Sequence, residues 1–334
     1  MATANAIQLR VVNKRFGPKV AVSNLDLEIP EGSLIGLIGP NGAGKTTTIR
    51  MIMSIIFPDS GSVEVLGKAS AVESKDRIGY LPEERGLYKK MKVGPFLKYV
   101  AQLKGMDSAG LEQKIRGWLE RVELADCYRK RCEELSKGMQ QKVQFIASVI
   151  HEPDLLILDE PFSGLDPVNS RLLRVLVEEQ HQRGCTLIFS THQMSQAEAL
   201  CDRVVMIDDG KKVLDNTLAE IHARYTPREL LFEPVQELDQ STEHAISSLE
   251  GVDSLSRNNG TTRVHLNDRA DGPRVLQRIA ATLPLKRIEL VRPTLEDVFI
   301  EIVAANAGSN EERERLRDTL AATSGNGRSD NSGD

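Results

Sequence analysis

Residues 39 to 47 combine three glycines with a lysine and two threonines, at a spacing that suits a bound triphosphate. In the pattern G-x-x-x-x-G-K-[ST], the glycines let backbone N–H groups surround the phosphates, and the following helix N-terminus favours negative charge. Lys45 is expected to reach the β- and γ-phosphates, and Thr46 to ligate Mg²⁺. The predicted loop consists of Gly39, Pro40, Asn41, Gly42, Ala43, Gly44, Lys45, Thr46 and Thr47. The sequence therefore predicts that the chain binds ATP or GTP.

Two adjacent carboxylates, Asp159 and Glu160, follow the apolar run 155–158. An acid at the end of a buried strand emerges at the edge of the sheet where ligands bind. We predict that Asp159 holds Mg²⁺ through water and that Glu160 polarises the attacking water. His192 ends another apolar run; a lone histidine is often an ordinary satisfied residue, but at this edge we predict a contact with the γ-phosphate.

A second candidate anion site lies at residues 135–139, Leu-Ser-Lys-Gly-Met. Ser136 is a suitable helix cap, Gly138 follows just inside the predicted helix, and a capped helix N-terminus attracts anions. The local sequence gives no reason why one chain needs a second phosphate site.

These residues are positioned by alternating apolar strands and helices, which indicate a parallel α/β sheet. The expected strands are 7–12, 22–29, 33–39, 154–160 and 186–192, and the expected helices are 47–56, 94–125 and 168–183. Phe96, Val100, Leu103, Ile115, Leu119 and Val122 recur at helical spacing within 94–125.

From about residue 222 the pattern changes to the order β-α-β-β-α-β, which predicts a small α+β domain of the ferredoxin-like kind. A hairpin is expected to turn at 258–260, and a final helix, 294–305, to pack this domain down. We expect domains at 5–221 (with a helical subdomain at about 88–150) and 222–305, and a disordered tail at 306–334.

The composition is that of an ordinary globular protein, with 40% hydrophobic and 27% charged residues in 334. A net charge of −5 gives no argument for nucleic acid as a partner. No apolar run approaches the roughly 18 residues of a membrane span, and we expect no secretion signal. The four cysteines form no CxxC pair, and we interpret them as mostly buried, reduced cytosolic thiols.

Five short motifs in order resemble the ATP-binding subunits of ABC transporters over roughly residues 5 to 220. They are the phosphate loop at 39–47, the signature at 135–139, LLILDEP at 155–161, SGLD at 163–166, and His192. The resemblance implies a P-loop ATPase fold, with a RecA-like core and antiparallel β and helical subdomains. It also implies ATP as the nucleotide and a homodimer of nucleotide-binding domains.

In that head-to-tail pair, Ser136 and Gly138 of one copy complete the ATP site of the other. Asp166 belongs to the loop that couples the two sites, and Phe16 matches the position that stacks on adenine. A core phenylalanine at a strand end is the alternative for Phe16.

The sequence departs from the family at two places. Lys137 and Met139 stand where Gly and Gln are usual, and Glu83 stands where Gln usually senses Mg²⁺ or water and relays the ATP state. Both departures resemble ATPases paired with sodium- and drug-exporting permeases, and 292–302 resembles the closing segment of exporter ATPases with an extra C-terminal domain. We keep the role of Glu83 as a metal and nucleotide ligand.

The stretch 85–104 has six basic residues and no acidic one. These are Arg85, Lys89, Lys90, Lys92, Lys98 and Lys104. The stretch is either a solvated face or a surface that meets the permease or anionic lipid headgroups. In the family the coupling helices of the permease dock in this region, which favours the second interpretation.

We therefore predict an ATPase that powers export through a separate integral membrane permease and lies peripherally on the cytoplasmic face of the membrane. A soluble ABC ATPase acting on nucleic acid or ribosomes is the alternative, but such proteins usually have two nucleotide domains or a long coiled-coil insertion. A non-catalytic regulator is disfavoured because Glu160 is present. For the C-terminal domain we favour a dimer-stabilising cap over a ligand-sensing regulator. The cargo is not determined by this chain.

Overall fold

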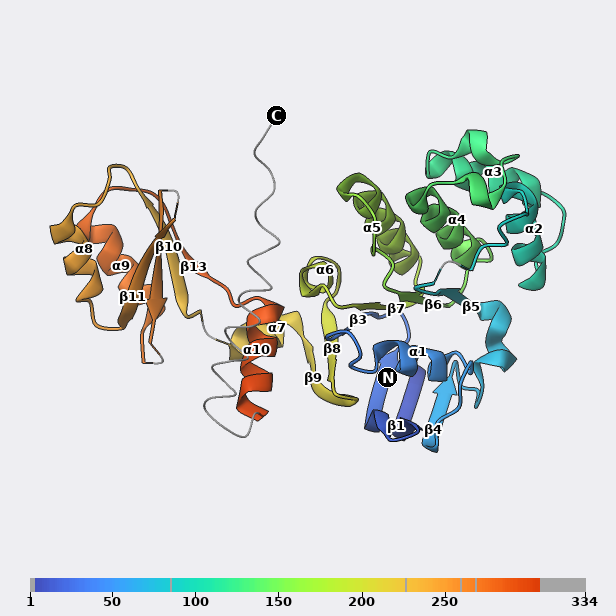
Figure 1. The fold of residues 1–334 in the computed structure, drawn as a ribbon, viewed down its shortest axis with the longest axis horizontal. Coiled ribbons are helices and arrows are strands. Elements are labelled where there is room, and N and C mark those ends of the chain that lie inside the picture. The colour runs from blue at the N-terminus through green and yellow to red at the C-terminus, as the bar shows by residue number, and fades with distance from the viewer. Residues whose placement is uncertain (1–3, 85, 226, 259, 268, 307–334) are drawn as a thin grey trace. The chain divides into compact units, whose positions relative to one another are not determined.

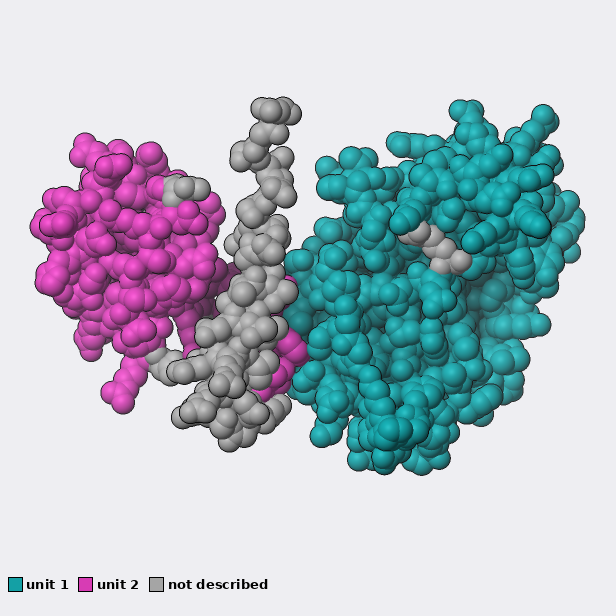
Figure 2. All heavy atoms as spheres, viewed as in Figure 1, with its two compact units in different colours: residues 1–218 teal, residues 219–334 magenta. Residues whose placement is uncertain are grey.

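The computed structural model describes residues 4–84, 86–225, 227–258, 260–267 and 269–306 (Figure 1). The chain divides into two compact units, residues 1–218 and 219–334 (Figure 2). This division lies close to the domain boundary expected from the sequence. The expected disordered tail falls outside the described residues, apart from its first residue.

A six-stranded sheet forms the centre of the first unit. Its order is β5 (Ile78–Leu81), β6 (Leu155–Asp159), β7 (Thr186–Thr191), β3 (Leu34–Ile38), β8 (Arg203–Asp208) and β9 (Lys211–Thr217). All pairs are parallel except β8–β9. Every residue of β3, β6 and β7 is buried, as continuous apolar strands in a sheet covered on both faces must be. The predicted parallel α/β sheet is confirmed.

Helices cover both faces of this sheet (Figure 1). On one face lie α4 (Lys137–Val149), α5 (Pro167–Gln182) and α6 (Met194–Leu200), and on the other lies α1 (Lys45–Ile52). Helix α4 approaches β5 so closely that a Cβ on Gly79 would lie 2.1 Å from the carbonyl oxygen of Ser148. Only glycine fits there. Helix α1 begins two residues before the predicted start at 47 and ends before the predicted 56.

An antiparallel sheet of three strands, in the order β2 (Lys19–Pro30), β1 (Asn5–Phe16) and β4 (Ser60–Val65), packs on the α1 side. Alternate residues of β1 and β2, including Ile7, Leu9, Leu25 and Leu27, join α1 and the facing residues of the six-stranded sheet in one apolar core. The N-terminal strands therefore hold α1, and with it the phosphate loop, against the sheet.

The predicted helical region contains α2 (Val93–Leu103) and α3 (Leu111–Arg121), followed by α4. Three short 3₁₀ turns lie at Ala71–Arg77, Ala125–Cys127 and Cys132–Glu134. Phe96 and Leu119 are buried as expected. The assignment of Leu103 to the apolar face is wrong, because at the last position of α2 its side chain is 57% exposed.

The second unit has the predicted β-α-β-β-α-β order, in one antiparallel sheet arranged β11-β12-β10-β13. Its elements are α7 (Leu218–Arg224), β10 (Glu229–Pro234), α8 (Gln240–Ser247), β11 (Val252–Asn258), β12 (Thr261–Leu266), α9 (Gly272–Thr282), β13 (Leu285–Val291) and α10 (Leu295–Asn306). Phe232, Val264 and Ile246 form its core with Val275 and Ile279 of α9. The sheet and helices of the predicted C-terminal domain are confirmed.

Helix α10 also has buried side chains, at Leu295, Val298 and Phe299, but these are not members of the apolar cluster under the sheet. In the part of the chain that the structure describes, no helix has the length and apolar character needed to cross a membrane. The four cysteines are buried free thiols, as the sequence indicated.

Candidate active site

The phosphate loop connects the buried strand β3 to α1, the strand–loop–helix context that its sequence requires. Gly44 is the N-cap residue of α1, with φ of 110°, and Gly39 has φ of 150°. A Cβ on Gly39 would lie 2.1 Å from the carbonyl oxygen of Ile207, and one on Gly44 would lie 2.5 Å from that of Ala21. Both glycines are thus fixed by backbone that approaches the loop from neighbouring strands, which leaves the first amides of α1 open to a ligand.

Lys45 is folded back over this loop, and its side chain is largely buried. Its Nζ donates to the carbonyl oxygens of Gly39 at 2.8 Å and Pro40 at 3.0 Å. Burial lowers the pKa of Lys45, and the nearby carboxylates of Glu160, Asp159 and Glu83 oppose that shift. The ammonium group is therefore held at the loop by carbonyl oxygens and negative charge, ready to bind phosphate oxygens.

Asp159 ends β6 and is 1% exposed. Its Oδ1 accepts from the hydroxyl of Ser190 at 2.5 Å and from that of Thr46 at 3.3 Å. Its Oδ2 is buried and has no hydrogen-bond partner among the described residues. Burial, the largest effect, raises the pKa of Asp159, while these two hydroxyls lower it.

A buried carboxylate oxygen without a partner is costly unless a cation or donor satisfies it. Oxygen ligands from a carboxylate and a hydroxyl are those that Mg²⁺ prefers. Asp159 Oδ2 and the Thr46 hydroxyl therefore fit the predicted metal site.

Glu160 follows directly, with a left-handed φ of 50° and a side chain that is 8% exposed. Its Oε1 accepts from the backbone N–H of His192 at 2.9 Å, and the His192 Nδ1 also lies 2.9 Å from it. The backbone N–H of Glu160 donates to the Ser190 hydroxyl at 3.2 Å and to the Ser190 carbonyl at 3.1 Å. The end of β7 thus fixes both the backbone and the side chain of this acid.

A cavity of about 380 Å³ brings most of the predicted residues together. It is lined by Phe16, Lys19, Ala21, Asn41, Gly42, Gly44, Lys45, Thr46, Thr47, Glu83 and Glu160. Phe16 is 50% exposed, so it is not the core residue that the alternative interpretation required. Phe16 lines the cavity together with the phosphate loop, and the Lys14 Nζ lies 5.5 Å from its ring centroid; an exposed aromatic ring here can stack on a base.

Two predicted residues, Ser136 and Asp166, cap helices elsewhere. Ser136 caps α4 by accepting from the Met139 N–H at 3.3 Å, and Asp166 caps α5 by accepting from the Asn169 N–H at 2.9 Å. Both are exposed. Gly138 is the second residue of α4, and its ideal Cβ position lies 3.5 Å from the Nδ2 of Asn169 in the first turn of α5. Ser136 is therefore the predicted helix cap, and none of these three residues lines the 380 Å³ cavity.

Sequence reasoning missed Ser190 and Tyr80. The parallel register pairs Asp159 with Ser190, which places the serine hydroxyl beside both acids. Tyr80 lies on the neighbouring strand β5, and burial, with a further contribution from Asp159, raises its pKa to about 12. Position at the end of an apolar run was the only available signal for Ser190, and it did not reveal which strand would be its neighbour.

The basic stretch needs one correction. Lys104 does not belong to an exposed basic face, because its Nζ donates to the carbonyl oxygens of Lys75 at 2.6 Å and Ile78 at 2.8 Å. Burial lowers its pKa. Lys89, Lys90, Lys92 and Lys98 are exposed as predicted, and Arg85 lies outside the described residues.

Comparison with known proteins identifies both parts of the chain. Residues 22–163 match the family model described as "ABC transporter", and residues 217–303 match "ATP-binding protein DrrA1-3-like, C-terminal domain". The chain is 40% identical over 294 residues to "Uncharacterized ABC transporter ATP-binding protein YhaQ" of Bacillus subtilis; the match covers 88% of this chain and 97% of that protein.

Two further matches cover about two thirds of this chain. "Nod factor export ATP-binding protein I" of Cupriavidus metallidurans is 35% identical over 64% of this chain and 72% of its own length. A solved structure titled "Structure of ATP binding subunit of ABC transporter" superposes with a TM-score of 0.61 at 28% identity, covering 66% of this chain and 92% of that chain. The phosphate loop, Asp159 and Glu160 lie within the residues that match the ABC transporter model.

Proposed function

The chain belongs to the ABC transporter ATP-binding proteins and is an ATPase, and from this premise we propose that it powers export through a separate integral membrane permease. The observation that carries the site assignment is the cavity in which the phosphate loop, Phe16 and Glu160 meet. Support for export comes from the relative named for Nod factor export. Sodium, a drug or a similar cargo fits this proposal, because the permease selects the cargo.

Within the proposed site, the chain's own residues bind and orient ATP. Lys45 exchanges its two loop carbonyls for oxygens of the β- and γ-phosphates, and the open amides of α1 bind the same groups. Phe16 stacks on the adenine. Thr46, Asp159 and Glu83 hold Mg²⁺, which when bound neutralises phosphate charge.

Glu160 is the proposed general base. Its Oε1 is occupied by the N–H of His192, so its Oε2 is the oxygen left to accept a proton from the attacking water. His192 orients this acid in the geometry described here, and its predicted contact with the γ-phosphate stays a prediction. Because Glu160 is largely buried, few bulk water molecules compete for that oxygen.

The second anion site supports a head-to-tail homodimer. The residues that line the 380 Å³ cavity come from β1, β2, the phosphate loop, α1, Glu83 and Glu160. The capped start of α4, with the exposed Ser136 and Lys137, is not among them. We propose that this helix start closes over the ATP of a second copy, with Asp166 at the junction.

The proposed permease surface combines exposed aromatic and basic side chains at the start of the helical region. Tyr88 is 55% and Tyr99 is 42% exposed, and their ring centroids are 5.9 Å apart. Leu103 is exposed on the same helix as Tyr99, and four exposed lysines belong to this segment. An apolar patch with a basic rim suits a protein surface next to anionic lipid headgroups.

The variant Glu160→Gln tests the proposal. It keeps the size and the acceptor for the His192 N–H, but it cannot take a proton, so we expect ATP hydrolysis to fall at least about a hundredfold. ATP should then convert the variant to a stable dimer, measured by light scattering alongside phosphate release.

Glu31→Gln is the control, because Glu31 is exposed on the turn before β3 and should leave both measurements at the parent level. ATP hydrolysis by Glu160→Gln at a rate close to that of the parent would show that Glu160 is not the general base. A monomer that retains bound ATP would contradict the dimer.

A further inference from the structure

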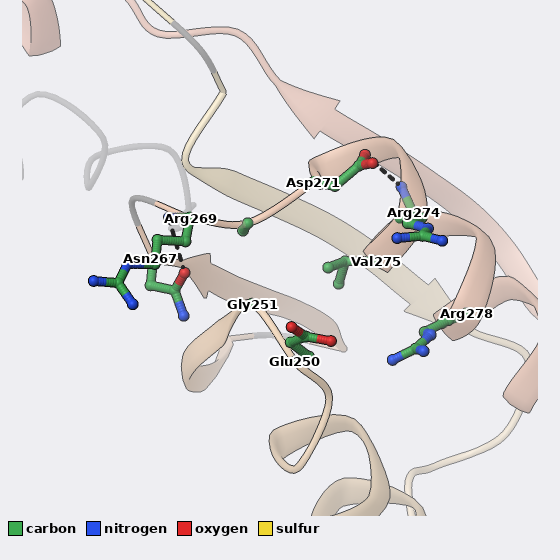
Figure 3. Close-up of a pocket in the computed structure, with 9 residues that line it drawn as sticks. Glu250, Gly251, Asn267, Arg269, Asp271, Arg274, Val275 and Arg278 are labelled. Atoms are coloured by element: carbon green, nitrogen blue, oxygen red, sulfur yellow. Dashed lines mark hydrogen bonds between the residues drawn. The ribbon is translucent and has the colours of Figure 1, made fainter.

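We propose that the second unit has a binding site of its own for a phosphate-bearing ligand. The site is a cavity of about 630 Å³, within the range of small-molecule pockets. It is lined by Glu250, Gly251, Asn267, Arg269, Ala270, Asp271, Arg274, Val275 and Arg278 (Figure 3). All of these residues belong to one unit, so the cavity does not depend on how the two units are arranged.

At the base of the cavity, the backbone of Gly251 packs closely against Ala270 and Val275. Gly251 has φ of 98°, and a Cβ there would lie 3.0 Å from the Cβ of Ala270 and 3.3 Å from Val275 Cγ2. The Asn267 N–H donates to the carbonyl oxygen of Gly251 at 3.0 Å, which ties the loop before α9 to the turn before β11. The hollow is therefore a fixed feature of the fold.

Three arginines line this hollow from two segments, and the guanidinium groups of Arg274 and Arg278 lie on the same side of it, whereas that of Arg269 extends away from α9 (Figure 3). Arg274 and Arg278 are four residues apart on α9, and Arg269 stands with Asn267 on the opposite side of the opening (Figure 3). No hydrogen bond or ion pair occupies these three guanidinium groups within the described residues. By contrast, Arg257, Arg263 and Arg287 of the same unit all pair with carboxylates.

The acidic residues of the cavity offset only part of this charge. Asp271 caps α9, where its Oδ1 accepts from the Arg274 backbone N–H at 3.1 Å. The lining has three arginines and two acids, which leaves one net positive charge next to a helix N-terminus. Glu250 stays available to accept from a hydroxyl or amino group of the ligand.

This donor set selects the ligand class. Arginine presents a planar fork of N–H groups that matches phosphate oxygens, and Arg274 and Arg278, one turn apart on α9, can bind one phosphate together. The Asn267 Nδ2 adds a neutral donor, since its Oδ1 already accepts from the Arg269 N–H at 3.1 Å. The ligand is a phosphate group with a hydroxyl or amine nearby, either on a soluble metabolite or on a phospholipid headgroup.

Hydrogen exchange of the full chain, followed by mass spectrometry, tests the site by position. The soluble probe is glycerol 3-phosphate, and the membrane probe is vesicles of phosphatidylglycerol in phosphatidylcholine, compared with phosphatidylcholine alone. With the ligand at ten times its dissociation constant, amide exchange in peptides from 269–282 should slow about tenfold. This applies to amides that exchange only after the ligand has dissociated and the site has opened.

The variant Arg274→Gln/Arg278→Gln should need a ligand concentration about tenfold higher or more to reach the same protection, because two phosphate-binding guanidinium groups are lost. Both side chains are exposed and unpaired, so the fold should persist. The matched control is Arg257→Gln/Arg287→Gln, which removes the same charge from the same unit but does not line the cavity.

Protection by glycerol 3-phosphate alone identifies a soluble phosphate compound, and protection by the anionic vesicles alone identifies a lipid headgroup; both results support the site. Protection by neither probe, or equal protection in the two double variants, overturns it. In the same experiment, hydrogen exchange in peptides of the phosphate loop reports nucleotide binding. A failure of this site is therefore distinguishable from a failure of the ATPase assignment.

Discussion

Gly44 and Glu160 both have left-handed backbone, for different reasons. Gly44 adopts it at φ of 110° without a side-chain penalty, and the carbonyl oxygen of Ala21, 2.5 Å from the ideal Cβ position, separately excludes a side chain there. Glu160 has it despite its side chain, at φ of 50°, and the two contacts of its N–H with Ser190 hold it there. Left-handed backbone in a non-glycine residue stores about 1–3 kcal/mol and is common at active sites. The strain places the carboxylate of Glu160 beside the phosphate loop.

Gly44→Ala should therefore abolish ATP binding and lower the free energy of unfolding by more than about 3 kcal/mol, because both strain and a 2.5 Å backbone clash arise. Gly184→Ala is the matched control, since Gly184 has φ of 93° but nothing lies within 4 Å of its ideal Cβ. Strain alone should cost that control about 1–2 kcal/mol. Fluorescent-nucleotide titration and urea unfolding measure the two effects, and equal losses in the two variants would refute the clash.

At the scale of elements, the segment after α4 is joined to the start of β5 by a half-buried histidine, His151. His151 Nε2 lies 3.2 Å from the carbonyl oxygen of Ile78, which also accepts from Lys104. The His151 Nδ1 is buried and has no hydrogen-bond partner in the described chain. Burial, and then the nearby positive charge of Lys104, lower the pKa of His151 to about 4, although the Ile78 contact and Asp76 oppose this shift. The histidine is therefore neutral in the folded protein at neutral pH.

This lowered pKa predicts a loss of stability in mild acid. Below the unfolded pKa of 6.5 the unfolded chain takes up a proton that the folded chain excludes until about pH 4, so the free energy of unfolding falls through that window. Between pH 7 and pH 5 the loss from this group should be about 2 kcal/mol. Urea unfolding followed by fluorescence of the single tryptophan, Trp118 in α3, measures it.

His151→Gln should remove that part of the pH dependence, because glutamine can still donate to the Ile78 carbonyl but does not titrate. His181→Gln is the control, since His181 also contacts a carbonyl oxygen, that of Gly32, in an exposed position. An unchanged slope in His151→Gln would show that other groups cause the acid sensitivity.

The whole molecule consists of an ATPase unit and a second unit whose contribution is open to experiment. The favoured hypothesis is a cap that stabilises the dimer, and the arginine-lined cavity gives the alternative, a ligand-sensing unit, a specific location. Both hypotheses predict that removal of the second unit changes the ATPase, but only the cap predicts weaker dimerisation without any added ligand.

A chain that ends after Tyr225 tests the cap. This end point keeps α7 intact, including the hydrogen bond from the Tyr225 N–H to Ile221, whereas an end at residue 221 would cut the helix. In the Glu160→Gln background we expect the ATP-driven dimer to dissociate at least about tenfold more readily, which is 1.4 kcal/mol. Light scattering over a concentration series measures the dissociation constant, and an unchanged value would count against the cap.

The sequence by itself determined the ATP-binding loop, the buried strands that flank it, the acid pair and the order of elements in the second unit. These depend on local spacing: the glycine pattern is typical of a phosphate loop, and an apolar run of four residues before two acids indicates a strand end. It also predicted that Ser136 caps a helix, because that preference depends on neighbours a few residues away.

Tertiary structure decided what lies next to what. The Ser190 hydroxyl donates a hydrogen bond to Asp159 because of a strand register that no local pattern encodes. Lys104 is not part of the exposed basic face because its Nζ donates to two carbonyl oxygens, 26 and 29 residues away in the sequence. The arginines of the second unit looked like ordinary helix and loop residues until Gly251 allowed the loop before α9 to close beside the turn before β11. Contacts between distant segments depend on packing of the whole core, and for that reason only the folded molecule shows them.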